Sequence, residues 1–120
     1  MESMDKKTQN LIIRKMRNTT RFWHISNNVR KAAKTRIVIG YFKNGKRKYK
    51  VMYKCAHCTT LQEKIEIDHI DEVGPFKGCW DIWMNRLFCE ESNLQALCRG
   101  CHQVKTDEYN EFRKTGGVFL

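Results

Sequence analysis

Apolar residues recur at helical spacing through the first third of the chain. Residues 8–17 mix apolar and basic side chains as a short basic helix does, and Asn18-Thr19-Thr20 interrupts them. From Thr20 to about Lys34 the apolar positions return every three or four residues, which predicts a second helix with a basic opposite face. Thr20 is its expected N-cap. The apolar positions of this second helix are Phe22, Ile25, Val29, Ala32 and Ala33.

The pattern then changes to the alternation of a β-hairpin. Residues 37–42 form the expected first strand, and Asn44-Gly45 is a pair favoured where a two-residue turn needs positive φ. Along residues 46–55 apolar and basic side chains alternate, so that Tyr49, Val51 and Tyr53 share one face. We expect this face to be half-buried. The opposite lysine stripe is either an ordinary exposed face or a track for phosphates.

The second half of the chain contains shorter predicted elements. Residues 65–70 are rich in β-branched side chains and predict a strand, and residues 80–88 predict a helix whose apolar stripe fits core packing. Residues 94–97 predict a brief strand, and a last helix is expected to begin near Cys101 or His102. We expect this mixture of helices and short strands to form an α+β fold. At 120 residues the chain is expected to form one domain with an appended arm.

Charge divides the chain into a basic and an acidic half. The formal net charge is +10, and residues 1–54 hold 16 Lys and Arg against 2 Asp and Glu, whereas residues 55–120 hold 7 against 11. A solubilising surface is one explanation. A polyanion such as DNA is favoured, because Lys and Arg displace the counterions condensed on nucleic acid. The expected DNA contacts are Arg30, Lys31, Lys34, Lys46, Arg47, Lys48, Lys50 and Lys54.

Targeting signals are the next question. No apolar run approaches the roughly 18–20 residues that cross a bilayer, and the first residues lack the apolar stretch of a signal peptide. We therefore expect a cytoplasmic protein without a membrane partner. In that reducing compartment the six cysteines predict metal ligands or free thiols rather than disulfides.

Four of the cysteines form two pairs with metal-ligand spacing. Cys55-x-x-Cys58 and Cys98-x-x-Cys101 are separated by 39 residues, and two such knuckles supply the tetrahedral sulfur set that structural zinc prefers. Four thiolates leave no position for water, so this Zn²⁺ is expected to be structural and to supply much of the folding free energy. The remaining cysteines, Cys79 and Cys89, are expected to be buried free thiols.

A second set of polar residues lies outside the zinc site. The segment Ile67-Asp68-His69-Ile70 and residues 93–106, in which Asn93 precedes His102 by nine positions, resemble the HNH nuclease family. The two knuckles resemble its zinc-stabilised branch, and residues 78–89 are similar to an insertion in small bacteriophage members. The resemblance covers about residues 47–115 and implies a ββα-metal fold. We therefore expect a basic N-terminal arm over residues 1–46, comprising helices and the first hairpin strand, and a zinc-bound nuclease core over residues 47–120.

The resemblance implies a metal-dependent endonuclease that hydrolyses phosphodiester bonds of DNA. His69 is the expected general base, since a neutral imidazole is available near physiological pH. Asp68 and His102 are the expected ligands of one divalent cation, and Asn93 is implied to orient the loop that carries the base. Some members have a further His where this chain has Thr106. Two protein ligands completed by water favour Mg²⁺ or Mn²⁺.

The neighbouring positions of Asp68 and His69 carry a structural expectation. Adjacent residues of a regular strand point to opposite faces, so both can reach one site only if the strand ends or bulges there. We therefore expect irregular backbone at this pair. Lys105 is either a contact to the cut phosphate or a solvated helix lysine.

Other functions stay open from the sequence. A zinc-ribbon accessory protein that binds nucleic acid without cutting it is the main alternative. The resemblance to phage proteins also implies roles in DNA packaging, with the large terminase subunit as partner, or in homing. Nicking and double-strand cutting both fit, and a homodimer would explain a double-strand break.

Overall fold

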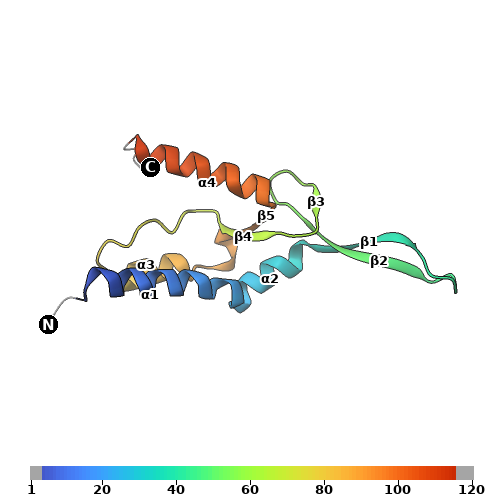
Figure 1. Cartoon of the computed structure of the whole chain (residues 1–120), viewed down its shortest axis with the longest axis horizontal. Helices are drawn as coiled ribbons and strands as arrows, with labels where there is room; N and C mark the ends of the chain where they lie inside the picture. Colours follow the sequence, from blue (N-terminus) through green and yellow to red (C-terminus); the bar gives the residue numbers. More distant parts are fainter. Residues whose placement is uncertain (1–3, 116–120) are drawn as a thin grey trace.

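The computed structural model describes residues 4–115, which begin with two helices (Figure 1). Helix α1 spans Lys6–Thr19 and starts earlier than predicted because Asp5 is its N-cap, with Oδ1 accepting from the Thr8 N–H at 2.9 Å. The predicted second helix is divided into a 3₁₀ turn, η1 Thr20–Phe22, and helix α2, His24–Ala33. Thr20 was expected to cap the second helix, but Trp23 occupies the N-cap position of α2. Phe22 was expected on the apolar face of that helix, but it is 78% exposed. Both expectations are wrong.

A long antiparallel hairpin follows, formed by β1 Lys34–Tyr41 and β2 Arg47–Lys54. Its loop has three residues rather than the predicted two: the Phe42 N–H donates to the Lys46 carbonyl at 2.8 Å, and the Gly45 N–H to the Phe42 carbonyl at 2.9 Å. Gly45 has a φ of 83°, whereas Asn44 does not have a positive φ. The Asn44 side chain instead accepts from the Lys46 N–H at 3.0 Å. A type I turn closed by a glycine bulge therefore replaces the predicted turn.

The hairpin extends away from the other elements (Figure 1), and the molecule including the hairpin measures 69 × 32 × 24 Å. The register places Tyr49 opposite Val38 and Val51 opposite Arg36, so these side chains share a face. Tyr49 is 46% exposed and Val51 39% exposed, and the expectation that this face is half-buried is wrong for the outer hairpin. Only the base of β2 gains a further neighbour, the unpredicted strand β3, Leu61–Gln62.

The second half contains two antiparallel strands followed by a helix. Strand β4, Glu66–His69, pairs with β5, Leu94–Leu97, and the connection between them holds α3, Trp80–Leu87, and the turn η2, Glu91–Asn93. Helix α4, Arg99–Lys114, follows β5 directly. It starts earlier than predicted because the Cys98 sulfur accepts from the Cys101 N–H and caps it. The predicted strands and helices of this half are confirmed, as is the α+β class.

Two small clusters of buried residues hold these elements together. Trp83 and Leu87 of α3 are almost fully buried and pack with Val73 and, from α1, Ile13 and Met16. The predicted packing role of the α3 stripe is confirmed. The other cluster joins Leu97 to the knuckle cysteines. Cys79 is exposed and Cys89 half-buried, so the expectation of two buried free thiols is wrong.

The predicted division at residue 46 falls in the hairpin loop, and α2 packs on β5 and β4. Residues 1–3 and 116–120, the outer ends of the two predicted segments, lie outside the described residues. None of the helices within residues 4–115 is long and apolar enough to span a bilayer.

Candidate active and metal sites

The four knuckle cysteines meet in space. The sulfurs of Cys55, Cys58, Cys98 and Cys101 all lie within 4.8 Å of one another, although they come from the end of β2, the following turn, the end of β5 and the first turn of α4. Each knuckle has the same internal bond: the Cys58 N–H donates to the Cys55 sulfur at 3.5 Å, and the Cys101 N–H donates to the Cys98 sulfur at 3.4 Å. The predicted cluster is confirmed, and it could hold a metal such as zinc.

The electrostatics of this cluster fit a cation. Burial raises the pKa of the Cys55 thiol, but hydrogen bonds from the backbone of Cys98, Cys58 and His57 outweigh it and lower that pKa to about 6. A hydrogen bond to the Cys98 sulfur raises the pKa of the Cys101 thiol to about 12. Four adjacent sulfurs cannot all carry negative charge without a counterion, so one keeps its proton. A bound divalent metal reverses this preference and deprotonates its sulfur ligands.

The short sheet of β4 and β5 lies between two helices. Glu66 and Asp68 point to one face, where they contact His102 and Lys105 of α4. The intervening Ile67 lines a cavity together with residues of η1 and α2, and Glu66 and His102 also line this cavity. Strand alternation therefore sorts the polar side chains of β4 toward α4.

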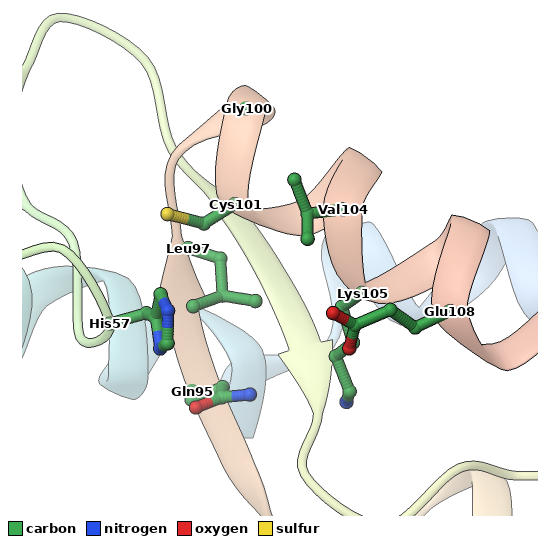
Figure 2. Close-up of a pocket in the computed structure, with 8 residues that line it drawn as sticks. All are labelled: His57, Gln95, Leu97, Gly100, Cys101, Val104, Lys105 and Glu108. Carbon is green, nitrogen blue, oxygen red and sulfur yellow. The ribbon is translucent and has the colours of Figure 1, made fainter.

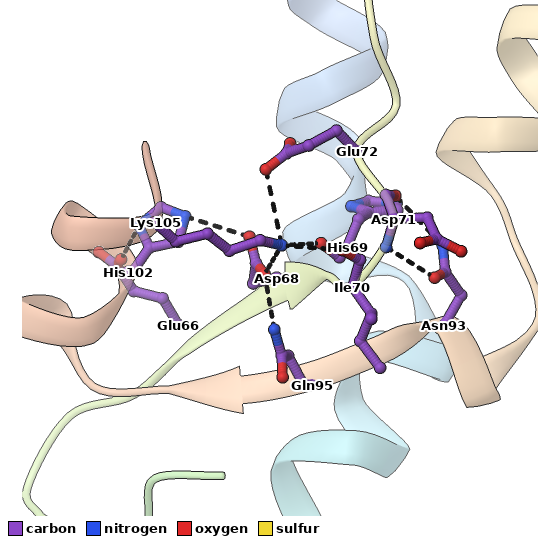
Figure 3. Close-up of polar contacts among 10 residues, drawn as sticks. All are labelled: Glu66, Asp68, His69, Ile70, Asp71, Glu72, Asn93, Gln95, His102 and Lys105. Carbon is purple, nitrogen blue, oxygen red and sulfur yellow. Dashed lines mark hydrogen bonds and ion pairs between the residues drawn. The ribbon is translucent and has the colours of Figure 1, made fainter. Parts of the chain in front are cut away.

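His102 lies between two carboxylates on that face (Figure 3). Its Nδ1 is 2.6 Å from Glu66 Oε2, and its Nε2 is 3.5 Å from Asp68 Oδ1. Because a carboxylate accepts a hydrogen bond, Nδ1 donates to Glu66, and Nε2 is the ring nitrogen that faces Asp68. Two ligands held at about 2.1 Å from one ion at right angles would be about 3 Å apart. The predicted pair Asp68 and His102 is therefore brought to a spacing that a shared cation can bridge.

Lys105 occupies the other side of Asp68. Its ammonium is 2.6 Å from Asp68 Oδ2, donates to the carbonyls of His69 and Ile70, and lies 3.5 Å from Glu72 Oε1 (Figure 3). Gln95 Nε2 also donates to Asp68 Oδ2 at 3.1 Å. The buried carboxylate is thus satisfied through Oδ2, while Oδ1 faces His102. Lys105 is therefore anchored at this site, with 26% of its side chain exposed.

His69 points elsewhere. Its Nε2 lies 2.7 Å from the Leu87 carbonyl at the end of α3. The carbonyl can only accept, so Nε2 carries a hydrogen and donates it to the Leu87 carbonyl. The β4–β5 register is regular through His69, where β4 ends, so a strand end rather than a bulge marks this pair. Within residues 4–115 the cysteine cluster is the one group of three or more potential ligands placed to hold a metal ion, so Asp68, His69 and His102 do not form another.

Asn93 holds the segment that follows His69. Its Oδ1 accepts from the Asp71 N–H at 2.9 Å, its Nδ2 donates to the Asp71 carbonyl at 3.4 Å, and its own carbonyl accepts from the Ile70 N–H at 2.7 Å. These bonds fix the chain on leaving β4. Asn93 therefore lies where a residue that orients this loop would lie.

Two residues of the site have contacts that were not predicted from the sequence, Glu66 with His102 and Lys105 with Asp68. Glu66 is two positions before Asp68, and strand alternation would have placed both on one face. Lys105 is one helical turn after His102, so its position beside the site also follows from helical spacing. Its pairing with Asp68 and two carbonyls depends on how α4 crosses the sheet.

The predicted DNA contacts form two groups. Lys46, Arg47 and Lys48 are exposed around the hairpin tip, where the Lys48 ammonium lies 5.0 Å from the centre of the Phe42 ring. Lys50, farther along β2, pairs with Glu63. The others lie on α2 and the hairpin base: Lys31, Lys34 and Lys54 are exposed, and Arg30 is half-buried.

A cavity of about 290 Å³ lies between β5 and α4, close to the cysteine cluster (Figure 2). Leu97 and Val104 supply apolar walls, and His57, Gln95 and Glu108 supply polar ones. His57 is exposed, as expected for a side chain that does not complete the cysteine site.

A protein of Lactococcus phage SK1 named "Probable HNH endonuclease" is 39% identical to this chain over 57 residues. The match covers 46% of this chain and 55% of the phage protein, so the chain spans about half the length of this curated relative. No family model matches, and no solved structure gives a significant match. The similarity and the four-cysteine cluster together fit an HNH family.

Proposed function

We propose that the protein is a metal-dependent HNH endonuclease that hydrolyses DNA phosphodiester bonds. The observation that carries the proposal is the 3.5 Å approach of His102 Nε2 to Asp68 Oδ1, on two antiparallel strands and a helix in a chain similar to a phage protein of that name. The ββα-metal assignment for β4, β5 and α4 belongs to the same proposal.

Asp68 and His102 would hold the catalytic Mg²⁺ or Mn²⁺, and the four cysteines would hold a structural Zn²⁺. When bound, the catalytic cation stabilises charge on the phosphate and on the leaving oxygen. Glu66 orients His102 through Nδ1, as carboxylates do for metal-binding histidines. The Lys105 ammonium donates a hydrogen bond to Asp68 Oδ2, so Oδ1 is the oxygen that would bind the cation.

His69 is proposed as the general base. The Leu87 carbonyl holds Nε2 with its hydrogen, so Nδ1 is the nitrogen that would take a proton from the attacking water. Asn93 supports this geometry through the Ile70 and Asp71 backbone, directly after the base. In this arrangement each residue of the proposed site has a distinct task.

A second function has an observation in its favour. The Lys105 ammonium already neutralises the Asp68 carboxylate, so the fold does not need a second cation for stability. A zinc-stabilised module that binds nucleic acid without cutting it would show the same pairing. Packaging with a large terminase subunit, homing, and homodimer formation remain predictions within either function.

A supercoiled plasmid distinguishes the two functions. The protein is incubated with plasmid in Mg²⁺, in Mn²⁺ or in EDTA, beside His69→Ala and a control, Lys114→Ala, in the exposed last turn of α4. We expect nicked or linear plasmid only with added metal, and near-total loss of cutting in His69→Ala alone. Metal-independent cutting, or equal cutting by the variant, would contradict the proposed mechanism. DNA binding without any cutting would favour the accessory module.

A further inference from the structure

The basic N-terminal segment and the proposed active site share a cavity. Arg21 of η1 and Arg30 of α2 line a space of about 350 Å³ whose other walls include Glu66 of β4 and His102 of α4. The sequence separates these arginines from His102 by more than 70 residues. The fold therefore places two arginines in the same cavity wall as a residue proposed to bind the catalytic cation.

The cavity lies at the open edge of β4. Among residues 4–115 this strand pairs with β5 alone, and the cavity is lined by three consecutive residues of β4 and its approach, Ile65, Glu66 and Ile67. Their alternating side chains reach toward α2 and toward α4, so the cavity spans the strand edge between the two helices. Its volume corresponds to about twelve molecules of liquid water, which is room for a phosphodiester group with part of its hydration.

The two arginines keep donors for an anion. Among the described residues neither Arg21 nor Arg30 has a carboxylate within 4.0 Å. Arg30 Nη1 makes a long 3.4 Å bond to Asn27 Oδ1, and the Arg21 guanidinium lies 5.6 Å from the centre of the Phe22 ring. The one acidic wall residue, Glu66, is 2.6 Å from His102 Nδ1. Guanidinium groups bind phosphate oxygens through two parallel N–H donors, which matches this unpaired set.

We propose that this cavity binds a backbone phosphate of DNA, with Arg21 and Arg30 as its ligands. This inference rests on the proposed function in one respect: the bound phosphate is a neighbour of the one that is cut. Positive charge continues from the cavity along α2 and the hairpin, because residues 30–54 hold ten Lys and Arg and no Asp or Glu. A DNA strand leaving the cavity would follow α2 toward the hairpin.

Binding rather than cutting tests the site. The affinity of the whole protein for a fluorescent DNA duplex is measured at several salt concentrations, without added Mg²⁺ or Mn²⁺, for Arg21→Ala, Arg30→Ala and Arg30→Lys. The matched control is Arg113→Ala, which removes the same charge about 16 Å along α4 from His102. Equal zinc content and thermal midpoint show that each variant is folded.

We expect each alanine variant to bind DNA about tenfold more weakly than the parent. The slope of log affinity against log salt concentration should become shallower by about 0.9. Arg30→Lys should keep the salt dependence but lose part of the affinity, because lysine cannot form the bidentate contact. Arg113→Ala should bind as the parent does. Alanine variants that match this control would overturn the phosphate site.

The outcomes separate this site from the proposed function. If the parent cuts plasmid but both alanine variants bind normally, the arginine site is wrong and the endonuclease stands. If the parent never cuts and the variants still lose binding, the phosphate site stands and the endonuclease is wrong.

Discussion

The ammonium of Lys105 lies 2.6 Å from Asp68 Oδ2, on the side of the carboxylate that does not face His102. The same ammonium donates to the carbonyls of His69 and Ile70 at the end of β4. One side chain of α4 therefore fixes both the carboxylate proposed to bind the cation and the backbone of the proposed base. A buried carboxylate requires such a partner, because removing its charge from water is costly.

Replacing Lys105 with methionine should destabilise the fold. The apolar chain keeps much of the volume but leaves the Asp68 carboxylate buried without the Lys105 ammonium, so we expect a loss of about 1–3 kcal/mol in the free energy of unfolding. Lys105→Arg should lose less, because the positive charge is kept. Urea denaturation of zinc-loaded protein measures both changes.

The control for this series is Lys114→Met, which changes an exposed lysine in the same helix. It should leave the unfolding free energy within about 0.5 kcal/mol of the parent. If Lys105→Met is as stable as this control, the Asp68–Lys105 pair does not hold β4 to α4.

The sequence predicted those parts of the site that depend on local spacing. Cys-x-x-Cys spacing located both knuckles, and β-branched content located β4. The orientation of His69 could not be predicted, because it depends on where the end of α3 presents the Leu87 carbonyl. The same holds for Arg21, whose place beside His102 depends on α2 packing against the sheet.

The hairpin shows why alternation alone was insufficient. Tyr49, Val51 and Tyr53 alternate with lysines as in a half-buried strand, but burial also needs a second layer to cover the face. The layer is absent over the outer hairpin within the described chain, where β2 pairs only with β1. A cation–π contact partly covers the Tyr49 ring instead, with the Arg36 guanidinium 4.7 Å from the centre of that ring.

Zinc loading should decide whether the domain folds. The buried clusters are small, so a metal held by four sulfurs would contribute a large share of the stability. We expect about one zinc per chain by elemental analysis, and loss of both the zinc and the cooperative thermal transition in Cys98→Ser. Cys79→Ser, an exposed cysteine outside the cluster, should retain both. A metal-free chain that still unfolds cooperatively at the same temperature would contradict a structural role.

Lys50 and Glu63 offer a test of the hairpin as a DNA contact. The hydrogen bond and charge of Lys50 lower the pKa of the Glu63 carboxyl. The ion pair is therefore fully formed at pH values above the usual pKa of Glu, and it is lost only as the pH falls through the lowered pKa. Glu63→Gln should free the ammonium, strengthen DNA binding at neutral pH and steepen its log–log salt dependence by about 0.9. Glu90→Gln, which removes an exposed carboxylate elsewhere, is the control. Equal gains in both variants would mean that net charge, not Lys50, is responsible.

Glu66 should set the metal requirement of the proposed reaction without taking part in bond breaking. Its carboxylate, 2.6 Å from His102 Nδ1, makes the opposite nitrogen a better ligand for a cation beside Asp68. Glu66→Gln keeps the size of the side chain but removes the charge. We therefore expect the Mn²⁺ concentration for half-maximal plasmid cutting to rise about 10- to 100-fold, with a near-parental rate at saturating Mn²⁺. Glu90→Gln should leave the half-maximal concentration unchanged. A lower maximal rate at an unchanged metal requirement would instead place Glu66 among the groups that act on the substrate, since a residue acting through His102 alters cation binding first.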